Sequence, residues 1–184
     1  PDDVGVDIVD NQLTMTPALN FHGEVTITVT VTDDGGLSDA TDFVLTVTPI
    51  NDAPVMTAIT DTSTAEEVPL MITVLSSDVD TGTGDGDENI PSYSAVSFSP
   101  DDVGVDIVDN QLTMTPALNF HGEVTITVTV TDDGGLSDAT DFALTVTPIN
   151  DAPVIEDIAS QDMDEDTTLD ITLSASDVDN GTGV

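Results

Sequence analysis

Residues 124–131 alternate between apolar and hydroxyl side chains without a break, reading Val-Thr-Ile-Thr-Val-Thr-Val-Thr. A period of two with β-branched residues throughout predicts a strand with one buried face. Shorter alternations predict strands over residues 70–74 and over residues 111–114, the latter ending at Pro116. The chain therefore reads as a series of short strands.

A turn and a returning strand are expected directly after residue 131. Residues 132–135 read Asp-Asp-Gly-Gly, which favours a turn. On the returning strand, Phe142, Leu144 and Val146 are expected to face inward. Six to eight such strands with turns every 8–12 residues predict an all-β fold, an antiparallel Greek-key β-sandwich, and no segment favours a helix.

The chain repeats itself with a period of 99 residues. Residues 1–55 and 100–154 are identical at 54 of 55 positions, and Val44 is replaced by Ala143. This period fits one immunoglobulin-like sandwich and is too long for a solenoid repeat. We expect a first unit (1–50, the late part of a repeat), a complete unit (51–149) and a third unit (150–184, the early part of the next repeat).

The segment between units is Thr-Pro-Ile-Asn-Asp-Ala-Pro-Val, at residues 48–55 and again at 147–154. Its two prolines favour a stiff, extended connector. Asn51 and Asp52 place side-chain oxygens on this connector, and oxygens are the ligands that hard cations prefer. We therefore expect cation-locked joints, called here the 51 joint and the 150 joint.

The charge of the chain makes a bound cation important. It has 37 Asp and Glu, no Lys, no Arg and no Cys, and a net charge of −37. This charge excludes nucleic acid and anionic membrane surfaces as partners, and no run of 18 apolar residues predicts membrane insertion. Because no side chain supplies positive charge, carboxylate repulsion opposes folding until cations bind. Millimolar calcium is an extracellular condition, which predicts an extracellular protein.

A glycine-rich acidic segment follows the strand at residues 70–74. Asp78 and Asp80 precede it, and Asp85 and Asp87 lie within it, separated by Gly86. Alternating carboxylates and glycines allow a loop to wrap around Ca²⁺, whereas Mg²⁺ prefers fewer protein ligands. The alternative is a solvated acidic loop without an ion.

Other chemistry has little support in the sequence. His22 and His121 occupy one repeat position and have no second His or Cys for a zinc site, so a hydrogen-bonding role in a loop is favoured. No nucleophile elbow and no phosphate-binding loop occurs, which argues against an enzyme. The threonines of residues 124–131 permit an alternative as a surface for sugar or ice, although Thr is also usual on the solvent face of a strand.

The run from Val124 through the Asp-Asp-Gly-Gly turn to Val154 resembles the last strands and linker of a cadherin repeat. Asp78-Val79-Asp80 resembles that family's Asp-x-Asp motif, and Glu66 matches its Glu on the first strand. The chain is most similar to the cadherin-like tandem repeats of bacterial surface adhesins, often secreted with RTX tails. In this family calcium binds between units and stiffens the rod.

The resemblance implies a ligand set for each joint. At the 51 joint it implies the residues Asn51, Asp52, Asp78, Asp80 and Asp132. At the 150 joint it implies Glu66, Asn150, Asp151, Asp177 and Asp179. Asp33 and Glu165 are the repeat equivalents of Asp132 and Glu66 and carry the same expectation.

Two departures from the family pattern modify this expectation. The linker lacks the first Asp and one Asn of the usual Asp-x-Asn-Asp-Asn-Ala-Pro. The family's Asp-Arg-Glu motif should fall near residues 117–119, which read Ala-Leu-Asn. Fewer ions per joint, or a shifted ligand set, is expected.

These observations predict calcium-stiffened spacer units of a secreted bacterial adhesin, which project a binding tip from the cell surface. Such a protein is extracellular, serves cell adhesion or biofilm formation, and has neighbouring repeats of its own chain as partners. The alternative is a calcium-dependent module that binds carbohydrate or ice through a Thr-rich or acidic-loop surface.

The two partial units carry a further expectation. Residues 1–50 hold the late strands of a sandwich and residues 150–184 the early ones, so each leaves an apolar face and strand edges uncovered. If these are true ends, the third unit of one molecule would complete the first unit of the next, in head-to-tail filaments. The alternative is that the sequence is a window on a longer array.

Overall fold

The computed structural model describes residues 3–80 and 91–179, and in these ranges all regular structure is β-strand. The first unit contributes two antiparallel hairpins. The strands are β1 (Val4–Val9) with β2 (Gln12–Pro17), and β3 (Gly23–Thr32) with β4 (Ser38–Val47). No helix in the described residues is long and apolar enough to cross a membrane.

The complete unit contains two main sheets. The larger sheet has the order β6 (Thr62–Ala65), β13 (Ser137–Thr147), β12 (Gly122–Thr131), β9 (Ser92–Ser97). The smaller sheet has the order β10 (Val103–Val108), β11 (Gln111–Pro116), β7 (Leu70–Thr73). The short strands β5 (Val55–Met56) and β8 (Ser76–Ser77) form a third pair.

The core lies between these two sheets, as the alternating sequence requires. Val124, Ile126, Val128 and Val130 of β12 are all buried, while the threonines between them are more exposed. They form one cluster with side chains of the smaller sheet, such as the fully buried Leu112. The predicted inward positions of the returning strand are also confirmed, because Phe142, Leu144 and Val146 are buried. The antiparallel sandwich is therefore confirmed.

The complete unit differs from a fully antiparallel sandwich in one pairing. β6 runs parallel to β13, with Thr62 opposite Leu144 and Ala65 opposite Thr147. The chain first pairs with β8 through β5. It then crosses over residues 57–61 to the larger sheet, where β6 pairs with β13. The described part of the complete unit has nine strand segments, against the six to eight strands expected. Of these, β7 and β8 form one extended run, because Val74 and Leu75 between them also form backbone hydrogen bonds.

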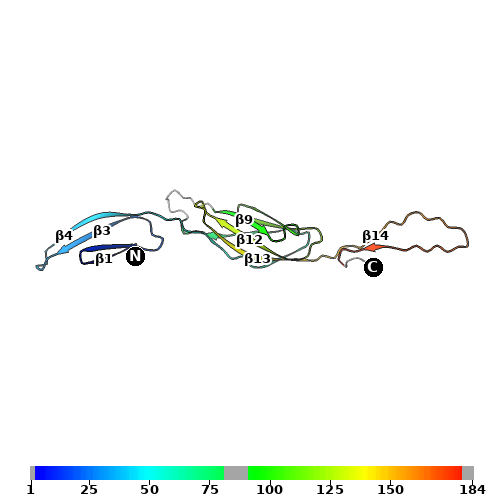
Figure 1. The fold of residues 1–184 in the computed structure, drawn as a ribbon, viewed down its shortest axis with the longest axis horizontal. Helices are drawn as coiled ribbons and strands as arrows, with labels where there is room; N and C mark the ends of the chain where they lie inside the picture. Colours follow the sequence, from blue (N-terminus) through cyan, green and yellow to red (C-terminus); the bar gives the residue numbers. More distant parts are fainter. Residues whose placement is uncertain (1–2, 81–90, 180–184) are drawn as a thin grey trace.

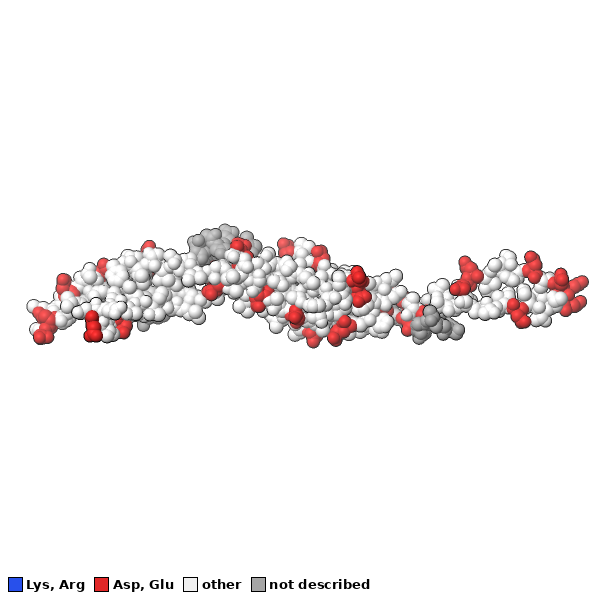
Figure 2. Space-filling view, in the orientation of Figure 1, with Lys and Arg blue, Asp and Glu red and all other residues white. Residues whose placement is uncertain are grey.

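The units follow one another along the long axis of the molecule (Figure 1). The described part of the third unit has one short pair, β14 (Val154–Ile155) with β15 (Ala175–Ser176). Among the apolar residues that the structure describes, Val4 and Ile27 are the only buried ones in the first unit, and none is buried in the third unit. Acidic side chains are spread over all three units in the view of Figure 2, without a basic one.

Candidate cation-binding joints

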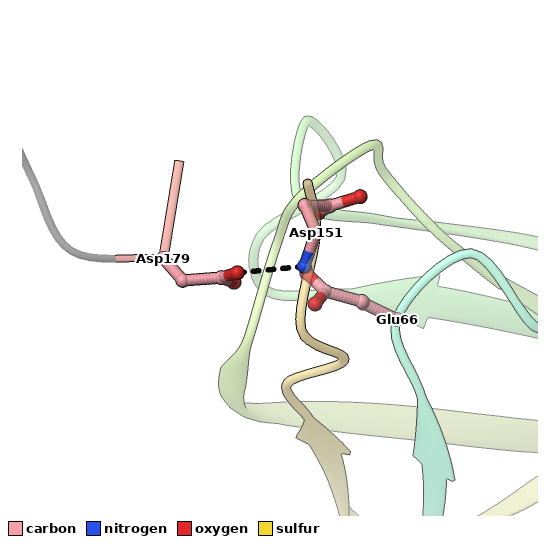
Figure 3. Close-up of side chains that lie close together, drawn as sticks. All are labelled: Glu66, Asp151 and Asp179. Atoms are coloured by element: carbon pink, nitrogen blue, oxygen red, sulfur yellow. Dashed lines mark hydrogen bonds between the residues drawn. The ribbon is translucent and has the colours of Figure 1, made fainter. Parts of the chain in front are cut away.

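Three carboxylates meet at the 150 joint. Glu66, Asp151 and Asp179 each present an oxygen, and these oxygens all lie within 4.8 Å of one another. Glu66 comes from the complete unit, Asp151 from the linker and Asp179 from the third unit, as Figure 3 shows. Three negative groups at this separation repel one another, and a divalent cation would relieve the repulsion.

Glu66 is fixed by the end of the β6–β13 pair. Its backbone N–H donates to the carbonyl of Thr147 at 2.9 Å, and its carboxylate accepts the backbone N–H of Ile149. The residue is only 2% exposed. A buried carboxylate without a basic partner is costly unless other groups compensate it. Among the described residues its carboxylate accepts a single N–H, which leaves capacity for a cation.

Asp151 and Asp179 are tied together across the boundary between linker and third unit. The backbone N–H of Asp151 donates to the Asp179 carboxylate at 2.7 Å, and the N–H of Asp179 donates to Asp177 Oδ1 at 3.0 Å. The side-chain amide of Asn150 donates to the carbonyl of Asp151 at 2.9 Å. Asp177 and Asn150 thus adjoin the three-carboxylate cluster without being members of it.

The 51 joint has the same arrangement on its downstream side. The N–H of Asp52 donates to the Asp80 carboxylate at 2.6 Å, and the N–H of Asp80 donates to Asp78 Oδ1 at 3.0 Å. Asp80 is 6% exposed. Within the described residues, the only group of three acidic side chains close enough to share an ion is the one at the 150 joint.

Asn51 provides an observation on its own. Its amide nitrogen donates to Asp132 Oδ2 at 2.9 Å, whereas its side-chain oxygen is buried and has no hydrogen-bond partner among the residues that the structure describes. Gly134 lies against this side chain, and a Cβ added to the glycine would lie 2.6 Å from the amide nitrogen. A buried acceptor without a donor is destabilising. A cation at the 51 joint would satisfy this oxygen.

Asp132 accepts the hydrogen bond from the Asn51 side chain. Burial raises the pKa of its carboxyl. Hydrogen bonds from the Asn51 side chain and from the backbone N–H groups of Leu136, Gly135 and Gly134 lower this pKa, and together they outweigh the effect of burial. The pKa of Asp132 therefore lies below its ordinary value. The N–H of Leu136 donates to Asp132 Oδ1 at 2.8 Å. Asp132 is therefore held in its charged form, as a cation ligand must be.

Two open cavities flank the 51 joint. One, of about 320 Å³, is lined on its polar side by His22, Asp52 and Asp80. The other, of about 310 Å³, is lined by residues that include Asp78, Asp132 and Tyr93. The hydroxyl groups of Tyr93 and Ser76 form a hydrogen bond of 2.8 Å beside this second cavity.

Two predicted ligands, Asp33 and Glu165, do not join these clusters, and two others cannot be placed. Asp33 lies in the β3–β4 turn, where its carboxylate accepts the N–H of Leu37 at 2.9 Å. Glu165 is exposed and precedes Asp166, whose φ is 63° like that of Glu67 in the equivalent turn. Asp85 and Asp87 lie outside the described residues.

Two acids that the sequence reading did not single out bind backbone groups of the complete unit. Asp61 Oδ1 accepts the N–H of Ala143 at 2.9 Å, and Asp138 Oδ2 accepts the N–H of Met56 at 2.8 Å. Both bonds join residues 82 apart in the sequence. Among so many acids, no local signal distinguishes them.

The threonines of β12 lie on the outward face of the larger sheet. The Thr127 hydroxyl donates to Asp141 at 2.6 Å, and the hydroxyls of Thr131 and Ser137 are 2.9 Å apart. Part of the predicted hydroxyl surface is thus bonded within the sheet. The use of this face for sugar or ice stays a prediction.

The model of the bacterial Ig domain family matches residues 51–145, which is more than half of the chain. The chain belongs to this family. No similar sequence was found among curated proteins. The matched range holds β5 to β12 and all but the last two residues of β13.

Solved structures of cadherin domains are similar in fold. Human CDH23 EC21-23 has a TM-score of 0.62 at 18% identity, covering 96% of this chain and 62% of that one. Protocadherin gamma B2 extracellular cadherin domains 3-6 has a TM-score of 0.57 at 19% identity, covering 97% and 50%. The chain thus spans about half to three fifths of the length of these structures. The cadherin-like fold expected from the linker and the Asp-x-Asp motif is confirmed.

Proposed function

We propose that this chain is a set of tandem spacer units of a bacterial surface protein, and that Ca²⁺ bound at the joints stiffens the array. The observation that carries this proposal is the cluster of Glu66, Asp151 and Asp179. Its members come from a unit, the linker after it and the next unit, so one ion there would connect all three. The joint would then be rigid only when the ion is bound.

The residues present fit a calcium ion. Ca²⁺ takes six to eight oxygen ligands from carboxylates, amide oxygens, carbonyls and water. At the 150 joint Glu66, Asp151 and Asp179 would hold it, with Asp177 and Asn150 adjacent. At the 51 joint the buried Asn51 oxygen, which has no partner in the described residues, indicates that a ligand belongs there as well.

The ion would supply positive charge that the sequence lacks. The 37 acids of the chain have no Lys or Arg to neutralise them. Each bound Ca²⁺ would offset the repulsion of several carboxylates at once, in contrast to the weak screening by monovalent salt. This supports an extracellular location, where calcium is abundant, and a spacer or extender role in a large adhesin.

Calorimetric titration of the chain with Ca²⁺ tests the proposal. We expect a heat of Ca²⁺ binding from the 150 joint. This heat should be lost in the double variant Glu66→Gln and Asp179→Asn. Small-angle scattering of the same samples should show a larger maximum dimension in Ca²⁺ than in chelator. Absence of binding at millimolar Ca²⁺, or an unchanged dimension, would reject the proposal.

A further inference from the structure

The Asp-Asp-Gly-Gly-Leu turn occurs twice in the described structure, at residues 33–37 and 132–136, with the same backbone arrangement. In each copy the N–H of the first Asp donates to the carbonyl of the Leu, at 2.9 Å in the first unit and 3.0 Å in the complete unit. The second glycine has a positive φ in both, 85° at Gly36 and 88° at Gly135. The two turns are therefore a matched pair within one molecule.

The two turns differ in what lies against their first glycine. In the complete unit, a Cβ built on Gly134 would lie 2.6 to 2.9 Å from the end of the Asn51 side chain, which belongs to the linker. In the first unit, the atoms nearest to such a Cβ on Gly35 all belong to Asp33 of the same turn, the closest at 3.2 Å. The β12–β13 turn lies at the end of the complete unit that faces the first unit, whereas the β3–β4 turn lies at the far end of the first unit (Figure 1). Of the two turns, the structure shows a linker covering only the one in the complete unit.

An Asp that precedes a Gly can isomerise through a cyclic imide. The backbone nitrogen of the glycine bonds to the side-chain carbon Cγ of the Asp, the bond from Cγ to its hydroxyl oxygen breaks, and one water leaves with the amide hydrogen. Water then opens the imide at either carbonyl, and one of the two products, isoaspartate, carries the chain through the former side chain. Glycine favours ring closure because it has no Cβ to hinder its nitrogen. The net reaction consumes nothing, and both Asp34 and Asp133 are exposed to water.

Ring closure at Asp133 requires the peptide group between Asp133 and Gly134 to rotate. In the structure the N–H of Gly134 bonds to the Asp132 carboxylate, and the same carboxylate accepts the Asn51 amide at 2.9 Å. Rotation would break the first of these bonds and would move Gly134 toward a side chain that already lies in contact with it. Asn51 must therefore leave the turn first, so the rate at Asp133 is reduced to the fraction of time for which the contact is open.

We propose that Asp133 and Gly134 form an isomerisation site that Asn51 keeps closed, and that the site opens when the linker separates from the turn. Asp34 and Gly35 are the same site without this cover. The proposal needs only the contact of Asn51 with the turn and is independent of whether a cation binds at the 51 joint.

Isomerisation at Asp133 would in turn damage the contact that prevents it. Isoaspartate adds one carbon to the backbone inside a turn that is closed by the bond from Asp132 to Leu136. The Asp132 carboxylate would then no longer be held where Asn51 meets it. A joint that has stayed open long enough to react could not close again in the same way.

The wild-type chain contains its own control for a test. The chain is incubated at physiological temperature and neutral pH in millimolar Ca²⁺ and is then cleaved after glutamate, which gives peptides 25–66 and 124–156, with one turn each and different masses. Electron-transfer fragmentation in a mass spectrometer distinguishes isoaspartate from Asp at each position. Isoaspartate should accumulate at Asp34 at least about fivefold faster than at Asp133, the factor expected for one net hydrogen bond. Equal rates at the two positions would overturn the proposal.

Removal of the Asn51 side chain tests the cover directly. In Asn51→Ala the rate at Asp133 should rise toward the rate at Asp34, and the rate at Asp34 should not change. Asn150→Ala is the matched control at the 150 joint and should alter neither rate, because the Asn150 amide bonds to the carbonyl of Asp151. An unchanged rate at Asp133 in a folded Asn51→Ala chain would overturn the proposal. Unfolding of this variant would raise both rates together, and the wild-type comparison then decides.

Discussion

The backbone N–H of Asp151 donates to the carboxylate of Asp179 at 2.7 Å and so connects the linker to the unit that follows it. The same bond occurs one period earlier, between Asp52 and Asp80 at 2.6 Å. Because the second Asp of each Asp-Val-Asp motif is positioned by the backbone of the linker, the downstream half of each joint is formed by hydrogen bonds alone. At the 150 joint the carboxylate of Glu66, from the preceding unit, lies beside this bond.

Stability should depend on calcium. One bound ion stabilises the folded state by about 2.7 kcal/mol when free calcium is a hundredfold above Kd. A change of 1 kcal/mol shifts the melting temperature of a domain of this size by about 4–8 °C. The melting temperature measured by calorimetry in millimolar Ca²⁺ should therefore be well above the melting temperature in chelator. Monovalent salt at matched ionic strength is the control, and equal melting in all three buffers would contradict the prediction.

Glu66→Gln should have opposite effects with and without calcium. Gln keeps an oxygen for the N–H of Ile149 but removes one charge from the cluster with Asp151 and Asp179. In chelator the melting temperature of the variant should be equal to or higher than that of the wild type, because the repulsion between the carboxylates of the cluster is reduced. In Ca²⁺ its affinity should fall at least about tenfold, or about 1.4 kcal/mol. Glu67→Gln is the control, since Glu67 is exposed and outside the cluster.

Acidification in calcium-free buffer should remove a contribution of Asp132. The pKa of this carboxyl is lowered in the folded state, so its stabilisation is present above the ordinary value of 3.8 and is lost as pH falls through the lower folded value. The carboxyl signal of Asp132 in an NMR titration should have its midpoint below 3.8. Asn51→Ala removes one of the bonds that lower the pKa and should move this midpoint upward; an unmoved midpoint would contradict the assignment.

Asp80→Ala should loosen the 51 joint more than it destabilises the complete unit. The Asp80 carboxylate accepts the N–H of Asp52, which belongs to the linker. Small-angle scattering in Ca²⁺ should show a shorter maximum dimension for the variant, while the melting of the complete unit changes little. Asp101→Ala, at an exposed acid of the same unit, is the control and should leave both unchanged.

Local pattern was sufficient to predict four strands of the sandwich, which correspond to β7, β11, β12 and β13. Residues 124–131 and the side chains of Phe142 and Leu144 have a period of two that allows only one buried face, and the structure follows it. The joint residues came from the resemblance of the linker and of Asp-Val-Asp to a known family. Their side-chain geometry at the joints is what the structure adds.

Other features could not be predicted because they depend on residues far apart in the sequence. Residues 62–65 read Thr-Ser-Thr-Ala and have no alternation, and their pairing with β13 is backbone bonding across about 80 positions. Asp61 and Asp138 bind specific N–H groups, yet nothing local separates them from the other acids. The hydrogen bond of Asn51 with Asp132 likewise depends on the folded turn that carries Gly134.

The cavity shared by Tyr93, Asp78 and Asp132 gives this molecule a built-in optical probe. Tyr93 is the only tyrosine of the chain, and the chain has no tryptophan. A luminescent lanthanide ion such as Tb³⁺, which replaces Ca²⁺ at oxygen sites, would receive excitation energy from this ring at the 51 joint. Because Tyr93 lies beside the 51 joint and residues 150–184 contain no tyrosine, the emission from this chain would report on the 51 joint.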